Sequence, residues 1–136
     1  MKKLLILLFC LLISLNTYSD SLQKSDFESK TYTYSQRINN VSYTIEQQYL
    51  KNGSLKTVSN GSDGSMNILE GEDNIWWVNN NFLYVQYQGQ KPIPFSFNFD
   101  TNSVSYNAAS RKFNMKIVNI EEGNLLEELL NDFENF

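Results

Sequence analysis

The sequence predicts a mainly β fold, a curved antiparallel meander or half-barrel of about seven to nine strands with one C-terminal amphipathic helix. Three observations lead to this prediction. Apolar and polar residues alternate with a period of two along much of residues 31–120, and turn-forming Asn, Gly and Asp residues separate these stretches. The period becomes helical only near the C-terminus. Residues 41–87 and the stretch just after them hold most of the large apolar side chains.

The N-terminus has the pattern of a secretory signal peptide. Two lysines precede an apolar run over residues 4–15, and Thr17 and Ser19 place small side chains at a cleavage site. The run is shorter than the roughly 18 residues that span a bilayer. We therefore expect residues 1–19 to be removed, leaving a single domain over residues 20–136. The expected location is periplasmic or secreted, with no stable membrane anchor after cleavage.

Composition limits the classes of partner and of stabilising bond. The 136 residues carry a formal net charge of -4, and the few Lys and Arg are scattered. Nucleic acids favour clustered positive charge, so no nucleic-acid partner is predicted.

The only cysteine, Cys10, lies inside the apolar run, without the preceding small residues that lipid attachment requires. A mature domain without cysteine must be stabilised by a packed core.

The first strands follow from the alternation of side chains. Residues 20–30 are polar and indicate either a short helix or a loose N-terminal arm. Tyr32 and Tyr34 then alternate with Thr and Ser, which is typical of a half-buried strand. A longer strand is expected over residues 41–49, and its apolar face consists of Val41, Tyr43, Ile45 and Tyr49.

Turn residues divide the remainder of the β region. Asn52-Gly53 predicts a two-residue type I′ turn, because both residues accept positive φ. Pro92 and Pro94 indicate a loop over residues 89–94, since proline cannot donate to a ladder. Met66 and Ile68 share one side of their strand. The later strands are expected over residues 54–59, 65–70, 75–78, 82–88, 95–99, 103–109 and 112–120.

Two adjacent tryptophans indicate that the sheet carries large aromatic side chains on both faces. A regular strand points Trp76 and Trp77 to opposite faces. One of them therefore lies outside the main core unless a second layer covers it. An exposed tryptophan beside tyrosines would form a contact surface for a partner.

The C-terminus has the period of a helix. Asn124 and Glu127 match the first and last residues of a capping box. The predicted helix plugs the open face or one end of the sheet, or it covers a ligand cavity or docks a partner. Its apolar stripe consists of Leu125, Leu126, Leu129, Leu130 and Phe133.

The residue types leave little room for catalysis. The chain has no histidine, and its mature part would have no cysteine, which excludes Ser-His-Asp and Cys-His arrangements and imidazole or thiolate metal sites. Glu70, Glu72 and Asp73 are interpreted as solvated turn residues rather than a catalytic pair. Residues 60–65 lack the spacing of an EF-hand loop. We expect a non-enzyme with no catalytic residue, metal or cofactor.

Three segments carry a resemblance to a known family. They read Tyr-Leu-Lys-Asn-Gly at residues 49–53, Ile-Leu-Glu-Gly at residues 68–71 and Ile-Trp-Trp-Val at residues 75–78. In this region, up to Tyr84, the chain resembles periplasmic lipoprotein-carrier proteins of the LolA type. The resemblance implies an incomplete curved antiparallel barrel whose concave face holds acyl chains under a helical lid. Unlike that family, this chain has no long helix before the first strand and none between later strands.

The first functional hypothesis is an exported, non-enzymatic protein that binds an apolar ligand, lipid or lipoprotein acyl chain, on the concave face. In the alternative packing, side chains fill this face as a solid core. The residues expected to contact the ligand are Tyr43, Ile45, Ile68, Trp76, Tyr84, Phe95, Phe97, Leu126, Leu130 and Phe133.

Two further hypotheses belong to other classes. A periplasmic or secreted interaction module, such as an inhibitor or immunity protein, would bind an envelope protein through an acidic and aromatic surface around residues 70–77. A surface or fibre component would assemble through its β-prone, Asn-rich segments, because exposed strand edges pair readily.

Overall fold

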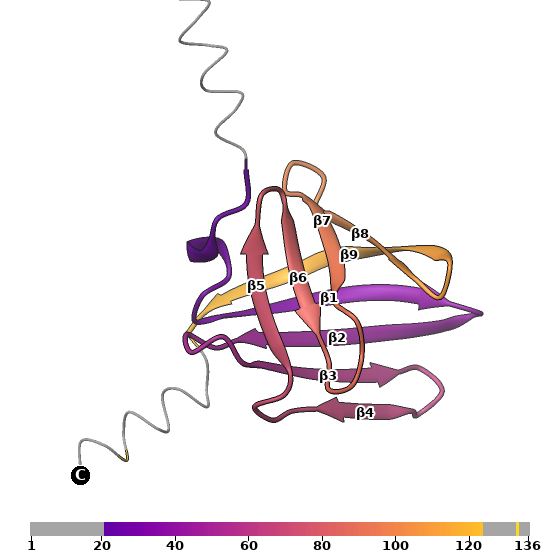
Figure 1. Ribbon diagram of the computed structural model, residues 1–136. Coiled ribbons are helices and arrows are strands. Elements are labelled where there is room, and N and C mark those ends of the chain that lie inside the picture. The colour runs from indigo at the N-terminus through magenta and orange to yellow at the C-terminus, as the bar shows by residue number, and fades with distance from the viewer. Residues whose placement is uncertain (1–20, 124–132, 134–136) are drawn as a thin grey trace, which may run out of the picture.

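The computed structural model describes residues 21–123 and Phe133. Nine antiparallel strands form one sheet in the order β4-β3-β2-β1-β9-β8-β7-β6-β5 (Figure 1). The predicted β class and meander are confirmed. The strands are β1 (Lys30–Ile38), β2 (Val41–Tyr49), β3 (Leu55–Gly61), β4 (Met66–Leu69), β5 (Ile75–Asn79), β6 (Phe82–Gln86), β7 (Ile93–Asn98), β8 (Ser103–Ala108) and β9 (Arg111–Glu122).

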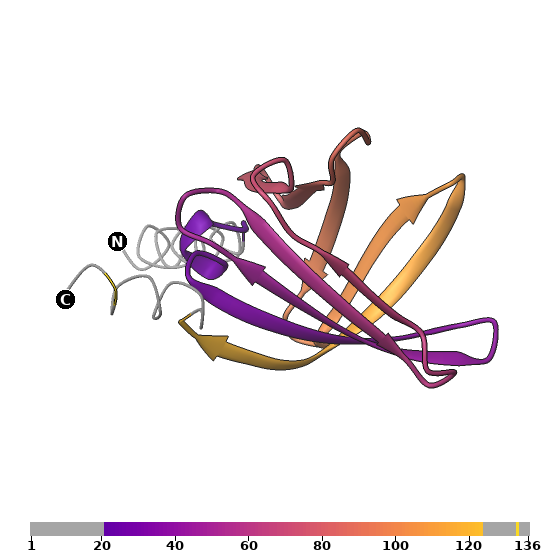
Figure 2. The same ribbon diagram turned by 90° about the horizontal axis from the view of Figure 1, so that it is seen from below.

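The connection between β4 and β5 requires the sheet to curl. These strands are consecutive in the chain, yet they form opposite edges of the sheet. Nine flat strands would separate the edges by about 38 Å, whereas the loop of residues 70–74 can reach only about 20 Å. The sheet therefore curls into a half-barrel. Its two meanders, β1–β4 and β5–β9, face each other across the concave side (Figure 2).

A short seam joins the two meanders where the half-barrel is closed. The Trp76 amide donates to the Gly53 carbonyl over 3.0 Å, and the Leu55 amide donates to the Asn74 carbonyl over 2.9 Å. The Trp76 indole N–H also donates to the Leu50 carbonyl over 2.9 Å. The beginning of β5 is thus bonded to the β2–β3 connection.

The pairing of β1 with β9 connects the two meanders in the middle of the sheet. Thr33 lies opposite Asn119 and Tyr34 opposite Ile117, so Val118 is an extra residue in β9. A bulge of this kind strengthens the local right-handed twist. It therefore contributes to the curvature at the point where the meanders join.

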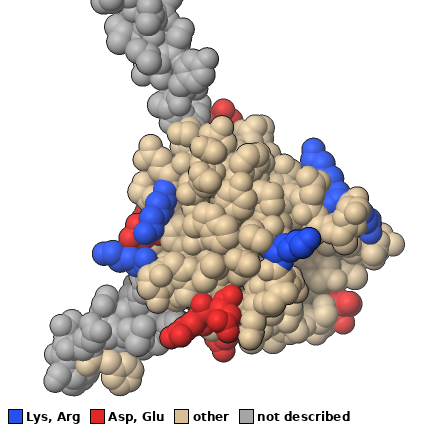
Figure 3. Space-filling model, in the orientation of Figure 1, with Lys and Arg blue, Asp and Glu red and all other residues tan. Residues whose placement is uncertain are grey.

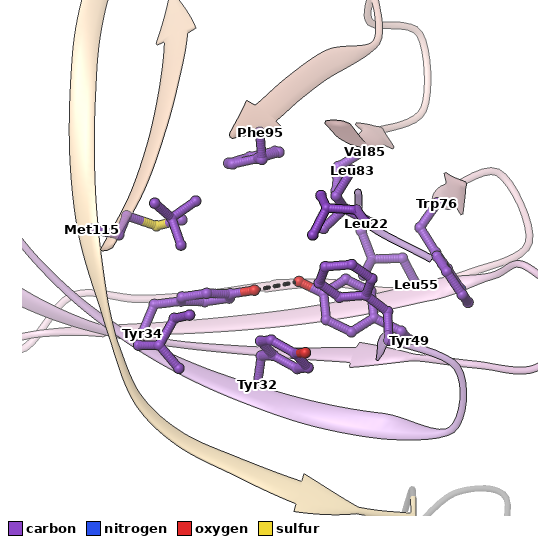
Figure 4. Close-up of a cluster of buried hydrophobic side chains, with 13 residues drawn as sticks. Leu22, Tyr32, Tyr34, Tyr49, Leu55, Trp76, Leu83, Val85, Phe95 and Met115 are labelled. Atoms are coloured by element: carbon purple, nitrogen blue, oxygen red, sulfur yellow. Dashed lines mark hydrogen bonds between the residues drawn. The ribbon is translucent and has the colours of Figure 1, made fainter. Parts of the chain in front are cut away.

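The core lies on the concave face. Side chains from both meanders point toward one another there (Figure 4), and Phe27, which follows the short 3₁₀ helix η2 (Lys24–Asp26), is completely buried among them. Its ring centroid lies 5.3 Å from that of Tyr49 and 5.0 Å from that of Phe97. The polar N-terminal segment thus contributes an anchor that closes one end of the half-barrel.

The predicted two-residue turn at Asn52-Gly53 is wrong. Tyr49 pairs with Leu55, so the connection spans residues 50–54, and only Gly53 has a positive φ, of 89°. The seam explains the wider loop, because the Gly53 carbonyl accepts a bond from β5. A two-residue turn with two positive φ values occurs instead at residues 39–40, both asparagines.

The predicted loop over residues 89–94 is too long. Ile93 and Pro94 already belong to β7, where Pro94 lies opposite Tyr84 of β6. The pairing of β7 with β8 begins one residue later, at Phe95. Proline is tolerated there because β8 has no residue opposite Pro94. The missing N–H therefore costs no hydrogen bond between β7 and β8.

Two predictions fall on other parts of the chain. The signal peptide over residues 1–19 and the predicted C-terminal helix, which follows Asn124 and has its apolar stripe over residues 125–133, lie outside the described residues, apart from Phe133. Across residues 21–123, no helix has the length and apolar character needed to cross a membrane.

Candidate functional site

A pocket of about 250 Å³ opens on the concave face, between β2–β4 on one side and β7–β9 on the other. The core beneath it is solid, since Tyr34 and Tyr49 are completely buried. A filled aromatic floor therefore lies beneath a small open space. The lining consists of Ile45, Gln47, Thr57, Ser59, Asn67, Leu69, Tyr87, Ile93, Phe95, Tyr106 and Met115.

The two walls of the pocket differ in chemistry. On the β2–β4 side, two apolar residues, Ile45 and Leu69, lie beside four side chains with hydroxyl or amide groups. We name these four residues the polar wall: Gln47, Thr57, Ser59 and Asn67. The opposite wall, with Ile93, Phe95 and Met115, is mostly apolar. None of the lining residues is charged. Such a pocket suits an uncharged ligand that is apolar along one side, because burying a charge without a partner is costly.

The Tyr87 hydroxyl joins the two walls. It accepts a hydrogen bond from Gln47 Nε2 over 3.3 Å and lies 3.2 Å from Thr57 Oγ1. The Tyr49 hydroxyl donates to Gln47 Oε1, and it lies 2.7 Å from the Tyr34 hydroxyl (Figure 4). This network of hydrogen bonds links Tyr87, which follows β6, to Tyr34 on β1. It therefore connects the two walls of the pocket.

A second bridge crosses the concave face over β9. Gln36 Nε2 on β1 donates to the Tyr106 hydroxyl on β8 over 2.8 Å. The Tyr106 ring also packs against Phe95, with centroids 4.7 Å apart. The bridge therefore fixes the orientation of one aromatic wall residue.

Burial controls the protonation of these tyrosines. Removal from water raises the pKa of Tyr34 and Tyr49 well above the ordinary tyrosine value. It also raises the pKa of Tyr87 and Tyr106, although hydrogen bonds from neighbouring side chains lower it in part. All four hydroxyls are neutral near pH 7, so they act as hydrogen-bond donors and acceptors.

Several of the sequence-predicted contact residues do point into the half-barrel. Ile45 and Phe95 line the pocket. Tyr43 is half-buried on the same face of β2, beside a neighbouring depression. Trp76 and Phe97 point inward but pack in the core near Phe27, away from the pocket.

The inward orientation predicted for Ile68 and Tyr84 is wrong. Ile68 is 49% exposed on the outer face of β4, because its neighbours Asn67 and Leu69 carry the inward positions. Tyr84 stacks on Trp77 on the outer face of β6. Strand β6 has large apolar side chains on both faces, so its sequence does not indicate which face is buried.

The remaining predicted contacts come from the C-terminal segment. Leu126 and Leu130 lie outside the described residues. Phe133 is described, and its side chain is 75% exposed.

The polar wall was missed by sequence reasoning. Gln47 shares the parity of Ile45 and Tyr49 in one strand, and this alternation could have identified it. Tyr87 follows the end of β6, and its role depends on the distant residues Gln47 and Thr57. No local pattern signals such a contact.

The described part of the chain contains no group of three or more His, Cys, Asp or Glu side chains able to hold a metal ion. Comparison of the sequence and structure with protein-family models, curated proteins and solved structures gives no match.

Proposed function

We propose that this protein is an exported, non-enzymatic binding protein that holds a small apolar ligand, such as a lipid or lipoprotein acyl chain, in the concave pocket. The observation that carries the proposal is the uncharged pocket of about 250 Å³ at the open side of the half-barrel. Burial of a ligand methylene against such a wall contributes about 0.8 kcal/mol.

The size of the pocket limits the ligand. Pockets for drug-sized molecules commonly measure about 300–1,000 Å³, so a space of about 250 Å³ suits a short chain or the end of a longer one. The rest of the ligand would extend through the open side into solvent. On the polar wall, the exposed Asn67 would contact a hydroxyl or ester group near the chain, because both polar groups of Gln47 are already hydrogen-bonded to tyrosines.

Methyl NMR tests the proposal directly. The exported protein, labelled at Ile and Met methyl groups, is titrated with decanol and with decanoic acid. We expect saturable shifts at Ile45, Ile93 and Met115, which line the pocket. Met66 and Ile68, exposed on the outer face of β4, serve as internal controls and should not shift.

A matched pair of variants separates pocket binding from surface adsorption. Asn67→Trp places a bulky ring at the pocket wall, whereas Asn60→Trp places the same ring at an exposed position of the adjacent strand β3. Decanol binding should be lost in the first variant and kept in the second. Equal binding by both variants, or shifts confined to Met66 and Ile68, would refute the proposal.

A further inference from the structure

The outer surface of β5 and β6 carries an aromatic cluster that the concave pocket does not use. Trp77 and Tyr84 stack with ring centroids 5.4 Å apart, and Phe82 packs edge-on against Tyr84 at 6.3 Å. Ile75 is 36% exposed and Phe82 is 40% exposed. We name Ile75, Trp77, Phe82 and Tyr84 the outer aromatic surface. Trp76, the neighbour of Trp77, is buried on the opposite side, as adjacent strand positions require.

This surface lies on an uncharged part of the sheet. No Asp, Glu, Lys or Arg occurs in β5, β6 or β7, whereas β1, β2, β3 and β9 all contain charged residues. Figure 3 shows a continuous field of uncharged side chains over β5 and β6. Protein–protein contact regions are depleted of charge and enriched in Tyr, Trp and Phe at their centre.

An acidic border adjoins the surface at the beginning of β5. The loop between β4 and β5 contains Glu70, Glu72 and Asp73, and all three are exposed. Figure 3 shows Asp and Glu side chains gathered below the uncharged field in this view. Lys56 Nζ lies 3.5 Å from Glu70 Oε2, and this ion pair offsets part of the negative charge of the loop. Glu72 and Asp73 leave this border negative, which favours a partner with positive charge opposite it.

We propose that the outer aromatic surface is a docking site for another protein, whose contact region is apolar at its centre and carries Lys or Arg where it meets the β4–β5 loop. The stacked rings of Trp77 and Tyr84 are held in place by each other, so little side-chain entropy is lost when a partner covers them. This surface lies on the opposite face of the sheet from the pocket, so the proposal stands independently of ligand binding.

A second copy of this chain fits the surface less well. From the beginning of β5 to the end of β7, residues 75–98 contain a single Lys or Arg, the exposed Lys91 in the β6–β7 loop. Another copy therefore offers little positive charge to the acidic loop. The chain also has a net charge of -4, so two copies repel each other. The charge pattern therefore favours a basic partner of different sequence.

Selection from a displayed library of random twelve-residue peptides tests the chemistry of the partner. The exported protein is the bait, and the Phe82→Ser variant is used to remove peptides that bind elsewhere. We expect the selected peptides to be enriched in Lys or Arg together with aromatic or aliphatic residues. Synthetic copies should bind Phe82→Ser about tenfold more weakly or worse. Glu72→Lys combined with Asp73→Lys should weaken binding and reduce its salt dependence.

The control substitution is at an exposed residue that lies outside the outer aromatic surface. Val118 is 59% exposed on β9, so Val118→Ser should leave binding unchanged. Peptides that bind Phe82→Ser as well as the unmodified protein, peptides without excess positive charge, or no enrichment at all would overturn the proposal. A dimer in sedimentation that Phe82→Ser dissociates would also overturn it, because the occupant would then be a second copy.

Discussion

The hydroxyl groups of Tyr34 and Tyr49 lie 2.7 Å apart in the completely buried centre of the concave face (Figure 4). Tyr49 donates onward to Gln47, and Gln47 donates to Tyr87 at the pocket. The floor of the pocket therefore depends on a chain of hydrogen bonds whose members come from both meanders. Loss of the Tyr49 hydroxyl therefore removes two of these bonds, whereas loss of the Tyr34 hydroxyl removes one.

The two tyrosines should respond differently to loss of the hydroxyl. Tyr49→Phe leaves the Tyr34 hydroxyl and Gln47 Oε1 without this partner, so we expect the free energy of unfolding to fall by about 2–4 kcal/mol. Tyr34→Phe removes only one bond to Tyr49, and the expected loss is about 1 kcal/mol. Urea unfolding followed by tryptophan fluorescence measures both. A larger effect of Tyr34→Phe would contradict the direction of this network.

Stability should fall at alkaline pH. The pKa of Tyr34 and of Tyr49 is higher in the folded protein than in the unfolded chain, so their contribution to stability is fully present below about pH 10 and is lost as the pH rises further. Each such tyrosine makes the free energy of unfolding fall by about 1.4 kcal/mol per pH unit in this window.

Urea titrations between about pH 8 and pH 11, combined with tyrosinate absorbance, check this expectation. Ionisation of the buried tyrosines should coincide with unfolding. Tyr34→Phe should reduce the slope. Full ionisation at the ordinary pKa while the fold persists would contradict the burial of these hydroxyls.

The seam at Trp76 should open when its indole donor is removed. Trp76→Phe leaves the Leu50 carbonyl without this bond and creates a small void, so we expect a loss of about 1–3 kcal/mol. Amide hydrogen exchange at Leu55, which donates to Asn74, should accelerate. Trp77→Phe is the matched control on the outer face, where the expected change is below about 0.5 kcal/mol. Unchanged exchange at Leu55 in Trp76→Phe would exclude the seam as a closing element.

The β8–β9 turn should accept a stabilising substitution. Ala109 and Ser110 have φ values of 50° and 62°, although neither residue favours the left-handed region. Replacement by Asn-Gly matches the type I′ turn that Ala108 and Arg111 close, so we expect a gain of about 1 kcal/mol. Thermal unfolding measures the change. The reciprocal control, Asn39→Ala with Asn40→Ala in the β1–β2 turn, should destabilise the protein.

The alternation of apolar and polar side chains along the sequence was sufficient to predict the strands. Alternation predicted a β meander, placed Tyr32 and Tyr34 on one face, and required Trp76 and Trp77 to lie on opposite faces. These features depend on neighbours in the chain, because successive side chains of a strand alternate whatever lies around it. Of the eleven residues that line the pocket, the local pattern indicated two, Ile45 and Phe95.

Which face of a strand is buried was decided by pairing partners. Ile68 has an apolar side chain but lies outside, because β4 pairs only with β3 at the edge of the sheet and its register turns Asn67 and Leu69 inward. In β6 both faces are apolar, and only the curvature of the sheet separates Leu83 and Val85 in the core from Phe82 and Tyr84 outside. A one-residue difference in register reverses every side chain of a strand.

The amino-acid sequence by itself determined the antiparallel β class, the positions of most strands and the supply of aromatic side chains. The tertiary structure alone decided the curl, the seam between Trp76 and Leu50, and the meeting of Tyr87 with Gln47 and Thr57. The physical reason is that strand formation is governed by local conformational preference and alternation. Closure instead depends on contacts between residues 26 to 40 positions apart, which form only when the short β4–β5 loop draws the two edges of the sheet together.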